Sequence, residues 1–294
     1  METIQYHGHD CVSLSNGIVR LLVTRRIGPR ILSFGFEGGA NLFASLPDFT
    51  TDRPGMGVFH FHGGHRLWHA PEEPSRTYMP DNLPLEIAAT DKGLLVIQPT
   101  EPHTGLQKSL EICLIEDSAR VTIIHRLANY GTADSSLAPW AITMFATGGT
   151  AILPQSKRET GVLPNRALAL WPYTAMSNPN VVWGDDLILV HAKMPTAFKV
   201  GFPNPRGWLA YWLDGTLFVK HAAFDPEARY YDFGSSSECY CNGQFLELET
   251  LAPIRSIKPG ETATHVETWE LHKNIACPNN ENEARQLVES LGLE

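Results

Sequence analysis

The sequence has no basic cluster, no long apolar run and few helix signals, and each absence excludes a class of protein. Acidic side chains outnumber basic ones by 32 to 23, so the formal net charge is −9. A chain of this charge without clustered Lys and Arg is not expected to bind nucleic acid or an anionic membrane surface. No apolar stretch is long enough to span a bilayer, so we expect no membrane partner.

Cysteine is scarce as well, and its spacing is not that of a disulfide framework. The five cysteines are Cys11, Cys113, Cys239, Cys241 and Cys277. Such a set fits free thiols in a reducing compartment. The first residues lack the basic start and apolar core of a signal peptide, so we expect a cytoplasmic protein. The chain also contains no phosphate loop, dinucleotide fingerprint or Gly-x-Ser-x-Gly nucleophile elbow.

Strand pairs joined by short turns recur along most of the chain. Asp214-Gly215 and Asn242-Gly243 each separate two apolar runs, and such dipeptides favour type I′ hairpin turns because both positions take positive φ. The predicted hairpins are 17–24 with 30–36, 85–90 with 94–98, 110–115 with 120–125, 208–213 with 216–221, and 237–241 with 244–250.

Residues 281–294 alone have helical periodicity, and residues 153–180, with four prolines, predict an irregular loop. We therefore predict one domain over residues 1–294. Its fold class is all-β: an antiparallel β-supersandwich of two large stacked sheets with a short C-terminal helix.

The stretch 57–73 is rich in histidine and contains the side chains best suited to bind a ligand or transfer a proton. As a strand, this stretch alternates so that His60 and His62 share one face, opposite Phe59 and Phe61. The pair Gly63-Gly64 allows close backbone approach or positive φ, which suits the wall of a pocket.

A second candidate segment is the strand expected at 245–251. Glu247 and Glu249 share a face there, and the preceding hairpin arm carries Glu238. Two carboxylates on an apolar strand are costly unless that face is wet, polar or occupied by a ligand. An ordinary solvent-exposed outer face would also explain the pattern. We expect this strand and the histidine-rich stretch to meet across one concave cleft.

Tryptophan and histidine suggest two different kinds of ligand. Tryptophan rings stack on the apolar faces of sugars, and Trp68 is the best candidate of the seven because its neighbours are polar. A metal site built from His60, His62, His65, His69 and Glu72 is an alternative. The spacing of its carboxylate does not match the similar cupin motif, so we assign no metal and no cofactor.

Three segments together resemble the galactose mutarotase-like (aldose 1-epimerase) superfamily, and a bacterial branch of it in particular. They are Gly28 to Phe34 with Gly39 to Phe43, His62-Gly63-Gly64, and Leu248-Glu249-Thr250 followed by Pro259-Gly260-Glu261. The resemblance spans nearly the whole chain and implies a sugar site on the concave sheet. It also identifies His62 as a sugar-binding histidine and Glu249 as the general base.

One position departs from that family. Its general acid is a histidine, and the similar stretch here, Trp140 to Phe145, places Ile142 at that position. Because isoleucine cannot transfer a proton, either another histidine takes the role or the chain does not exchange anomers.

We therefore predict a protein that binds a small-molecule carbohydrate and acts as a sugar epimerase of the mutarotase type. The predicted catalytic residues are Glu249 as base and His62 or His65 as acid, and the predicted substrate contacts are Arg66, Trp68, Glu247, His60 and Trp140. A catalytically silent sugar-binding protein and a metal-dependent lyase or isomerase are the alternatives. The sequence indicates neither the sugar nor the oligomeric state.

Overall fold

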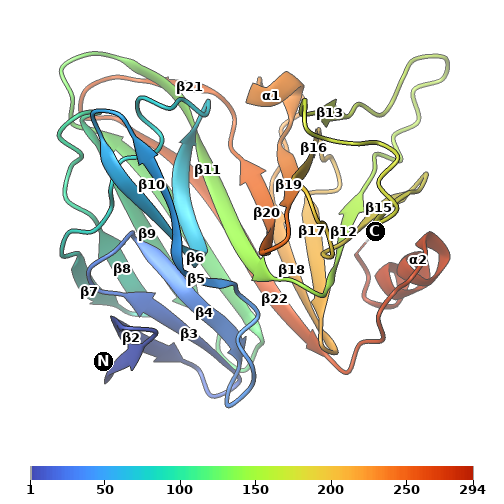
Figure 1. Cartoon of the computed structure of the whole chain (residues 1–294), viewed down its shortest axis with the longest axis horizontal. Coiled ribbons are helices and arrows are strands. Elements are labelled where there is room, and N and C mark those ends of the chain that lie inside the picture. The colour runs from blue at the N-terminus through green and yellow to red at the C-terminus, as the bar shows by residue number, and fades with distance from the viewer. Residues whose placement is uncertain (1, 294) are drawn as a thin grey trace.

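The computed structural model describes residues 2–293 and contains two large antiparallel sheets that share one hydrophobic core (Figure 1). This confirms the predicted fold class. The first sheet has twelve strands: β1 (Glu2–Tyr6), β2 (His9–Ser15), β3 (Val19–Thr24), β4 (Arg30–Phe36), β5 (Ser45–Arg53), β6 (Gly57–Ala70), β11 (Ser135–Ala146), β13 (Ala169–Leu170), β16 (Phe198–Phe202), β19 (Ser237–Cys241), β20 (Phe245–Leu251) and β21 (Arg255–Ile257).

The second sheet has ten strands: β7 (Glu86–Thr90), β8 (Gly93–Ile97), β9 (Leu106–Leu114), β10 (Arg120–Asn129), β12 (Thr150–Pro154), β14 (Val181–Trp183), β15 (Leu187–His191), β17 (Trp208–Leu213), β18 (Thr216–Ala222) and β22 (Thr262–Lys273). Strands of the first sheet run in the order β1-β2-β3-β4-β6-β11-β20-β19-β16-β13, with β5 on β6 and β21 on β11. This order places β6 and β20 on either side of β11, so a single strand separates the two predicted site segments.

All five predicted hairpins form, and one uses a different turn from the expected one. Asp214 and Gly215 both have positive φ, as a type I′ turn requires. Asn242 and Gly243 are not among the described residues with φ above zero. Instead the Asn242 side chain accepts hydrogen bonds from the backbone N–H groups of Gln244 and Phe245. The hairpin therefore turns around an asparagine side chain rather than through left-handed backbone.

The helical and irregular segments lie where the sequence places them. Helix α2 (Glu281–Ser290) is capped by Asn280, whose side chain accepts from the Glu283 N–H, and buries Ala284 and Val288. The helix ends at Ser290, so residues 291–293 of the predicted helix are not helical. Residue 294 of the predicted helix lies outside the described residues. Between β12 and β14 the only regular element is β13, which confirms an irregular stretch there. No helix within residues 2–293 is long and apolar enough to cross a membrane.

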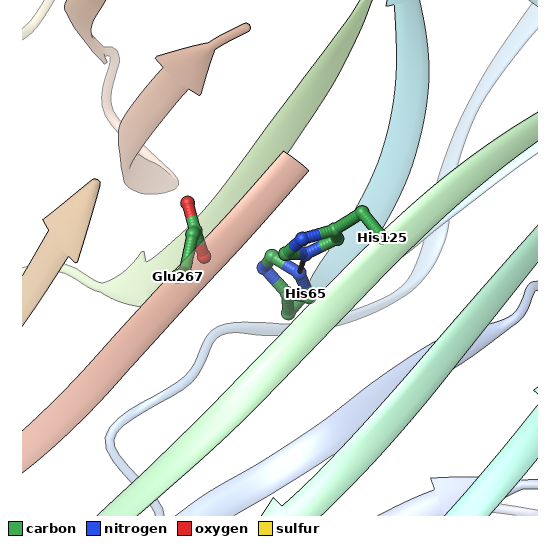
Figure 2. A group of neighbouring side chains, drawn as sticks. All are labelled: His65, His125 and Glu267. Atoms are coloured by element: carbon green, nitrogen blue, oxygen red, sulfur yellow. Dashed lines mark hydrogen bonds between the residues drawn. The ribbon is translucent and has the colours of Figure 1, made fainter. Parts of the chain in front are cut away.

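A polar network crosses the core and ties the site strands to the second sheet. His65 on β6, Thr143 on β11 and Thr250 on β20 meet His125 on β10, Lys220 on β18, and His265, Glu267 and Trp269 on β22; all are buried. Figure 2 shows His65 and His125 facing each other beside Glu267. Glu267 pairs with Lys220 at 2.8 Å and also accepts from Thr250 and from Trp269 Nε1.

The hydrogen bonds fix the protonation of the two facing imidazoles. A carbonyl oxygen can only accept, so His125 Nδ1 carries the proton that it donates to the His265 carbonyl, 3.1 Å away. Neutral His125 then accepts at Nε2 from His65 Nε2, at 2.7 Å. His65 in turn accepts at Nδ1 from the Thr143 hydroxyl, which itself accepts from Lys220 Nζ. Each imidazole nitrogen of His65 and His125 has a hydrogen-bond partner in this series. The network therefore holds β6, β11 and β22 together without exposing a charge.

We expect the buried histidines to make the fold sensitive to acid. Burial lowers the pKa of His125 to about 4 and that of His265 to about 3. In the unfolded chain these groups take up protons near pH 6.5, whereas in the folded chain they do not. Stability is therefore lost as the pH falls from about 6.5 toward 4, by about 1.4 kcal/mol per pH unit for each histidine.

Urea denaturation at a series of pH values measures this slope. Replacing His125 with Gln removes one titrating group and makes the slope shallower, whereas His103→Gln, at an exposed position, leaves it unchanged. A free energy of unfolding that stays flat from pH 7 to 4 would contradict neutral burial of the cluster.

Candidate functional site

The candidate site is a cleft on the face of the first sheet that points away from the second sheet. Its volume is about 240 Å³, and β6, β11, β16, β19 and β20 contribute to its walls. The lining is mostly aromatic, with four charged side chains: Phe49, Phe61, Arg66, Trp68, Glu72, Tyr78, Trp140, Ile142, Tyr173, Ala197, Lys199, Tyr240, Phe245 and Glu247. Pockets for drug-sized ligands measure about 300–1,000 Å³, so this cleft suits a smaller molecule.

Strand register explains why these residues meet. Ile142 on β11 is paired with Arg66 on one side and with Glu249 on the other, and Glu249 is paired with Glu238. One step along the same face, Glu247 is paired with Tyr240, and Tyr240 with Lys199. Leu246 and Leu248 alternate with the glutamates and enter the core between the sheets. The predicted division of this strand into an acidic face and an apolar face is confirmed.

Arg66 and Glu247 form an ion pair within the cleft. Arg66 Nη2 lies 3.0 Å from Glu247 Oε1, and the guanidinium stacks on Trp68 with its carbon 4.1 Å from the ring centre. Two further nitrogens of Arg66, Nε and Nη1, are buried and have no hydrogen-bond partner. Burial, opposed by Arg66 and reinforced by the Glu249 carboxylate, raises the pKa of Glu247 to about 7. Glu247 therefore changes charge near neutral pH.

Lys199 holds the other two carboxylates behind the cleft. Its ammonium lies 3.0 Å from Glu249 Oε2 and 2.7 Å from Glu238 Oε2, and both glutamates are fully buried. Trp140 Nε1 donates to the same Glu249 oxygen at 2.8 Å. Burial alone would lower the pKa of Lys199, but the two carboxylates hold that pKa well above its usual range. Lys199 is thus a permanent cation between the two glutamates, while burial and the neighbouring Glu249 hold the pKa of Glu238 well above its usual range.

A third polar pair closes one side of the cleft. Tyr78 donates its hydroxyl hydrogen to Glu72, and the Arg53 guanidinium lies 4.1 Å from the centre of the Tyr78 ring. Burial and the Glu72 carboxylate raise the pKa of Tyr78, so its phenol stays protonated at neutral pH. Glu72 and Glu247 are the two carboxylates that line the cleft.

The structure brings five of the eight predicted site residues together. Arg66, Trp68, Trp140 and Glu247 line the cleft, and Glu249 lies directly behind it, bonded to Trp140 and Lys199. Glu249 is fully buried, so Glu247, not Glu249, is the carboxylate of this strand that a ligand can contact.

His60 and His62 lie on the face of β6 that points away from the cleft. The alternation of side chains along this strand is interrupted after Phe61. His62, Gly63 and Gly64 all have positive φ, at 56°, 88° and 72°. Phe59 and Phe61 before this segment, and Arg66 and Trp68 after it, all belong to the cleft side. His62 instead packs against His9, with ring centres 4.9 Å apart, and burial lowers its pKa to about 3. The expectation that His62 faces the carboxylates is not met.

His65 lies in the core network described above and has no exposed surface. Burial holds its pKa well below the usual range, so it stays neutral. The residues considered for a metal site are therefore split: His60 and His62 lie on one face, His65 and His69 point into the core, and Glu72 lines the cleft. Within residues 2–293, only His65, His125 and Glu267 come close enough together to share an ion. Their ligand atoms are already hydrogen-bonded to one another or to Lys220, Thr250 and Trp269.

Comparisons with known proteins address the fold. The sequence matches no family profile and no curated protein. Solved structures do match. A galactose mutarotase-like protein from Lactobacillus casei has a TM-score of 0.58 at 9% identity over 89% of this chain and 100% of its own. One from Clostridium acetobutylicum has a TM-score of 0.56 at 10% identity over 92% and 98%. The chain has the galactose mutarotase-like fold.

A larger protein contains the same fold as one part. A TPR-domain containing protein from Parabacteroides distasonis matches with a TM-score of 0.63 at 15% identity, over 93% of this chain. This chain spans 50% of that protein's length. At these identities the likeness establishes the mutarotase-like fold and not the chemistry, so the site is argued from its own residues.

Sequence reasoning missed several cleft residues of this mutarotase-like fold. Lys199, Phe49, Tyr173 and Tyr240 come from separate segments, and no short motif connects them. The one available signal was Lys199 itself, a lone charge inside the apolar run Phe198 to Phe202. A lysine in such a strand needs a buried anion, and the glutamates on β19 and β20 supply it.

We expect Lys199→Met to destabilise the protein by about 3–5 kcal/mol, because it leaves the Glu238 and Glu249 carboxylates buried without a cation. Denaturant unfolding measures the loss. Adding Glu238→Gln to that variant removes the repulsion between the two buried carboxyl groups and recovers part of the stability. Lys193→Met, at an exposed position nearby, is the control and should cost little. If Lys199→Met alone were as stable as the parent, the Lys199 ammonium would not be needed to stabilise the buried glutamates.

Proposed function

We propose that the cleft binds one monosaccharide in its pyranose form and that the protein is a sugar epimerase of the mutarotase type. Trp68 and Trp140 supply apolar faces, while Arg66, Glu72 and Glu247 supply partners for hydroxyl groups. Solved structures with the same fold are described as galactose mutarotase-like proteins. All five cysteines are free thiols, which supports the cytoplasmic location that we propose with it.

The observation that carries the proposal is the position and the pKa of Glu247. In anomer exchange the proton of the C1 hydroxyl is removed as the C1–O5 bond breaks and a C1 carbonyl forms. The ring oxygen then takes up a proton. A group with a pKa of about 7 can both accept and return that proton at neutral pH.

In the proposed reaction one carboxyl group, that of Glu247, carries out both proton transfers, and no imidazole takes part. Glu247 accepts the C1 hydroxyl proton and then passes it to O5, while Arg66 stabilises the charge that develops on O5. Rotation about C1–C2 and reversal of the steps give the other anomer, so no proton is gained or lost. Glu249, the base expected from the family resemblance, has a positioning role in this scheme through Lys199 and Trp140.

A second candidate function is sugar binding without catalysis. It is favoured by Ile142, which lines the cleft at the position of the family's acid, and by the absence of His62 and His65 from the cleft lining. The two candidates differ in turnover, not in binding.

Anomer exchange measured by NMR across a panel of hexoses separates them. We expect the protein to accelerate exchange for at least one hexose. Glu247→Gln should reduce the rate by about 100-fold or more, since it removes the proton-transfer group but keeps the shape of the side chain. Glu289→Gln, on an exposed face of α2, is the matched control. Saturable sugar binding with no acceleration in the parent protein would establish the silent binder instead.

The pH dependence of exchange provides an independent test. Glu247 acts as a base only when ionised, so the rate per enzyme should rise with pH through about 7 and level off above it. The residual rate of Glu247→Gln should not show this rise with pH. A rate that falls as the pH rises through 7 would mean that the essential group must be protonated, and would remove Glu247 from the base role.

A further inference from the structure

We propose that Phe233 and Tyr173 form a second sugar-binding position at the rim of the cleft, so that the ligand is a disaccharide or the end of a longer glycan. This inference rests on the proposed function, because it extends the ligand of the same cleft. The cleft itself, at about 240 Å³, suits one ring, and any further ring must lie at its rim.

Phe233 is costly for the folded protein in two ways. Its side chain is 96% exposed, the largest exposure of any aromatic residue among the exposed hydrophobics of residues 2–293. Its backbone is left-handed, with φ of 59°, and the preceding Asp232 is left-handed as well, with φ of 51°. Bulky residues rarely adopt that conformation, and a phenyl ring in water contributes nothing to the core. Two such costs at one residue favour a ligand contact.

The short element that carries Phe233 is anchored to the cleft through the two residues that precede Phe233. α1 (Tyr231–Gly234) begins with Tyr231, which packs against the aromatic cluster that includes Trp68 and Trp140. Asp232 is half-buried beside Glu238 and Lys199, which form an ion pair behind the cleft. Phe233 thus projects from a turn whose two preceding residues lie against the walls of the site.

A second segment at the rim, 170–176, also carries exposed aromatic and apolar side chains. Tyr173 lines the cleft yet is 46% exposed, and its ring centre lies 6.3 Å from that of Tyr240. Thr174 fixes this wall to β16 by accepting from the Lys199 N–H and donating to the Lys199 carbonyl. Leu170 and Met176, on the same segment, are exposed as well. In Figure 1 α1 lies beside β13 and β16, close to where the segment that follows β13 begins.

The chemistry of the rim favours a sugar ring over a peptide. Two exposed aromatic rings offer flat apolar faces, as Trp68 and Trp140 do inside the cleft, and the Asp232 carboxylate next to Phe233 can accept from hydroxyl groups. Tyr173 belongs both to this rim and to the lining of the proposed monosaccharide site. A glycan that fills the cleft with its terminal ring would place its next ring there.

Calorimetric titration of monosaccharides and of their α-1,4 and β-1,4 disaccharides tests the inference. We expect at least one disaccharide to bind about tenfold more tightly than its constituent monosaccharide. In Phe233→Asn this ratio should fall toward one, since asparagine removes the ring and tolerates left-handed backbone. The thermal midpoint of that variant should not fall. Tyr130→Asn, which removes an exposed ring at a different pocket, is the matched control and should keep the parent's ratio.

The outcomes separate the two claims. Monosaccharide binding with no gain for any disaccharide overturns the rim site and leaves the proposed function intact. A disaccharide gain that survives in Phe233→Asn and in Tyr173→Ala also overturns it. The absence of binding by any sugar overturns the proposed function and this inference together, and would point to a protein partner for the exposed apolar surface.

Discussion

The left-handed segment His62-Gly63-Gly64 determines what each part of β6 can do. A Cβ at Gly63 would lie 2.0 Å from the Ala44 carbonyl oxygen, and one at Gly64 would lie 2.2 Å from that of Ile31. The buried Arg30 guanidinium holds the turn from one side by donating to the carbonyls of Phe61 and Gly63. Because the segment inverts the alternation of the strand, Phe61 and Arg66 both reach the cleft while His65 enters the core. The site and the network between the sheets thus depend on one backbone irregularity.

Charge compensation divides the acidic face into two kinds of carboxylate. Glu238 and Glu249 are enclosed and share the ammonium of Lys199, so they hold aromatic walls in place. Glu247 is paired with a guanidinium, lines the cleft and has a pKa of about 7. The difference arises from depth, not from residue type, since all three are glutamates on neighbouring strands. Depth therefore decides which of these carboxylates a ligand can contact.

The sequence predicts the fold and one face of the site well, and fails where local rules are broken. Alternation identified Glu247 and Glu249 as one face, and turn residues identified the hairpins, because both follow from strand geometry. Alternation also separated His62 from Phe61 correctly. It could not show that Arg66 and Trp68 share the face of Phe61, since a single left-handed segment inverts every side chain beyond it. The partners of Lys199 lie about 40 and 50 positions away along the chain, and only tertiary packing brings them together. Burial depth, which separates Glu249 from Glu247, has no signal in the residues themselves.

The histidines show how the same residue type serves stability or chemistry according to solvation. An imidazole with a pKa lowered by burial stays neutral, donates at one nitrogen and accepts at the other, and so links strands in a chain of hydrogen bonds. An imidazole that acts as a general acid must instead be charged and face its substrate. His65 and His125 meet the first requirement and cannot meet the second. Ile142, which lines the cleft, cannot transfer a proton, whereas Glu247 beside it in the lining has a pKa that burial raises to about 7.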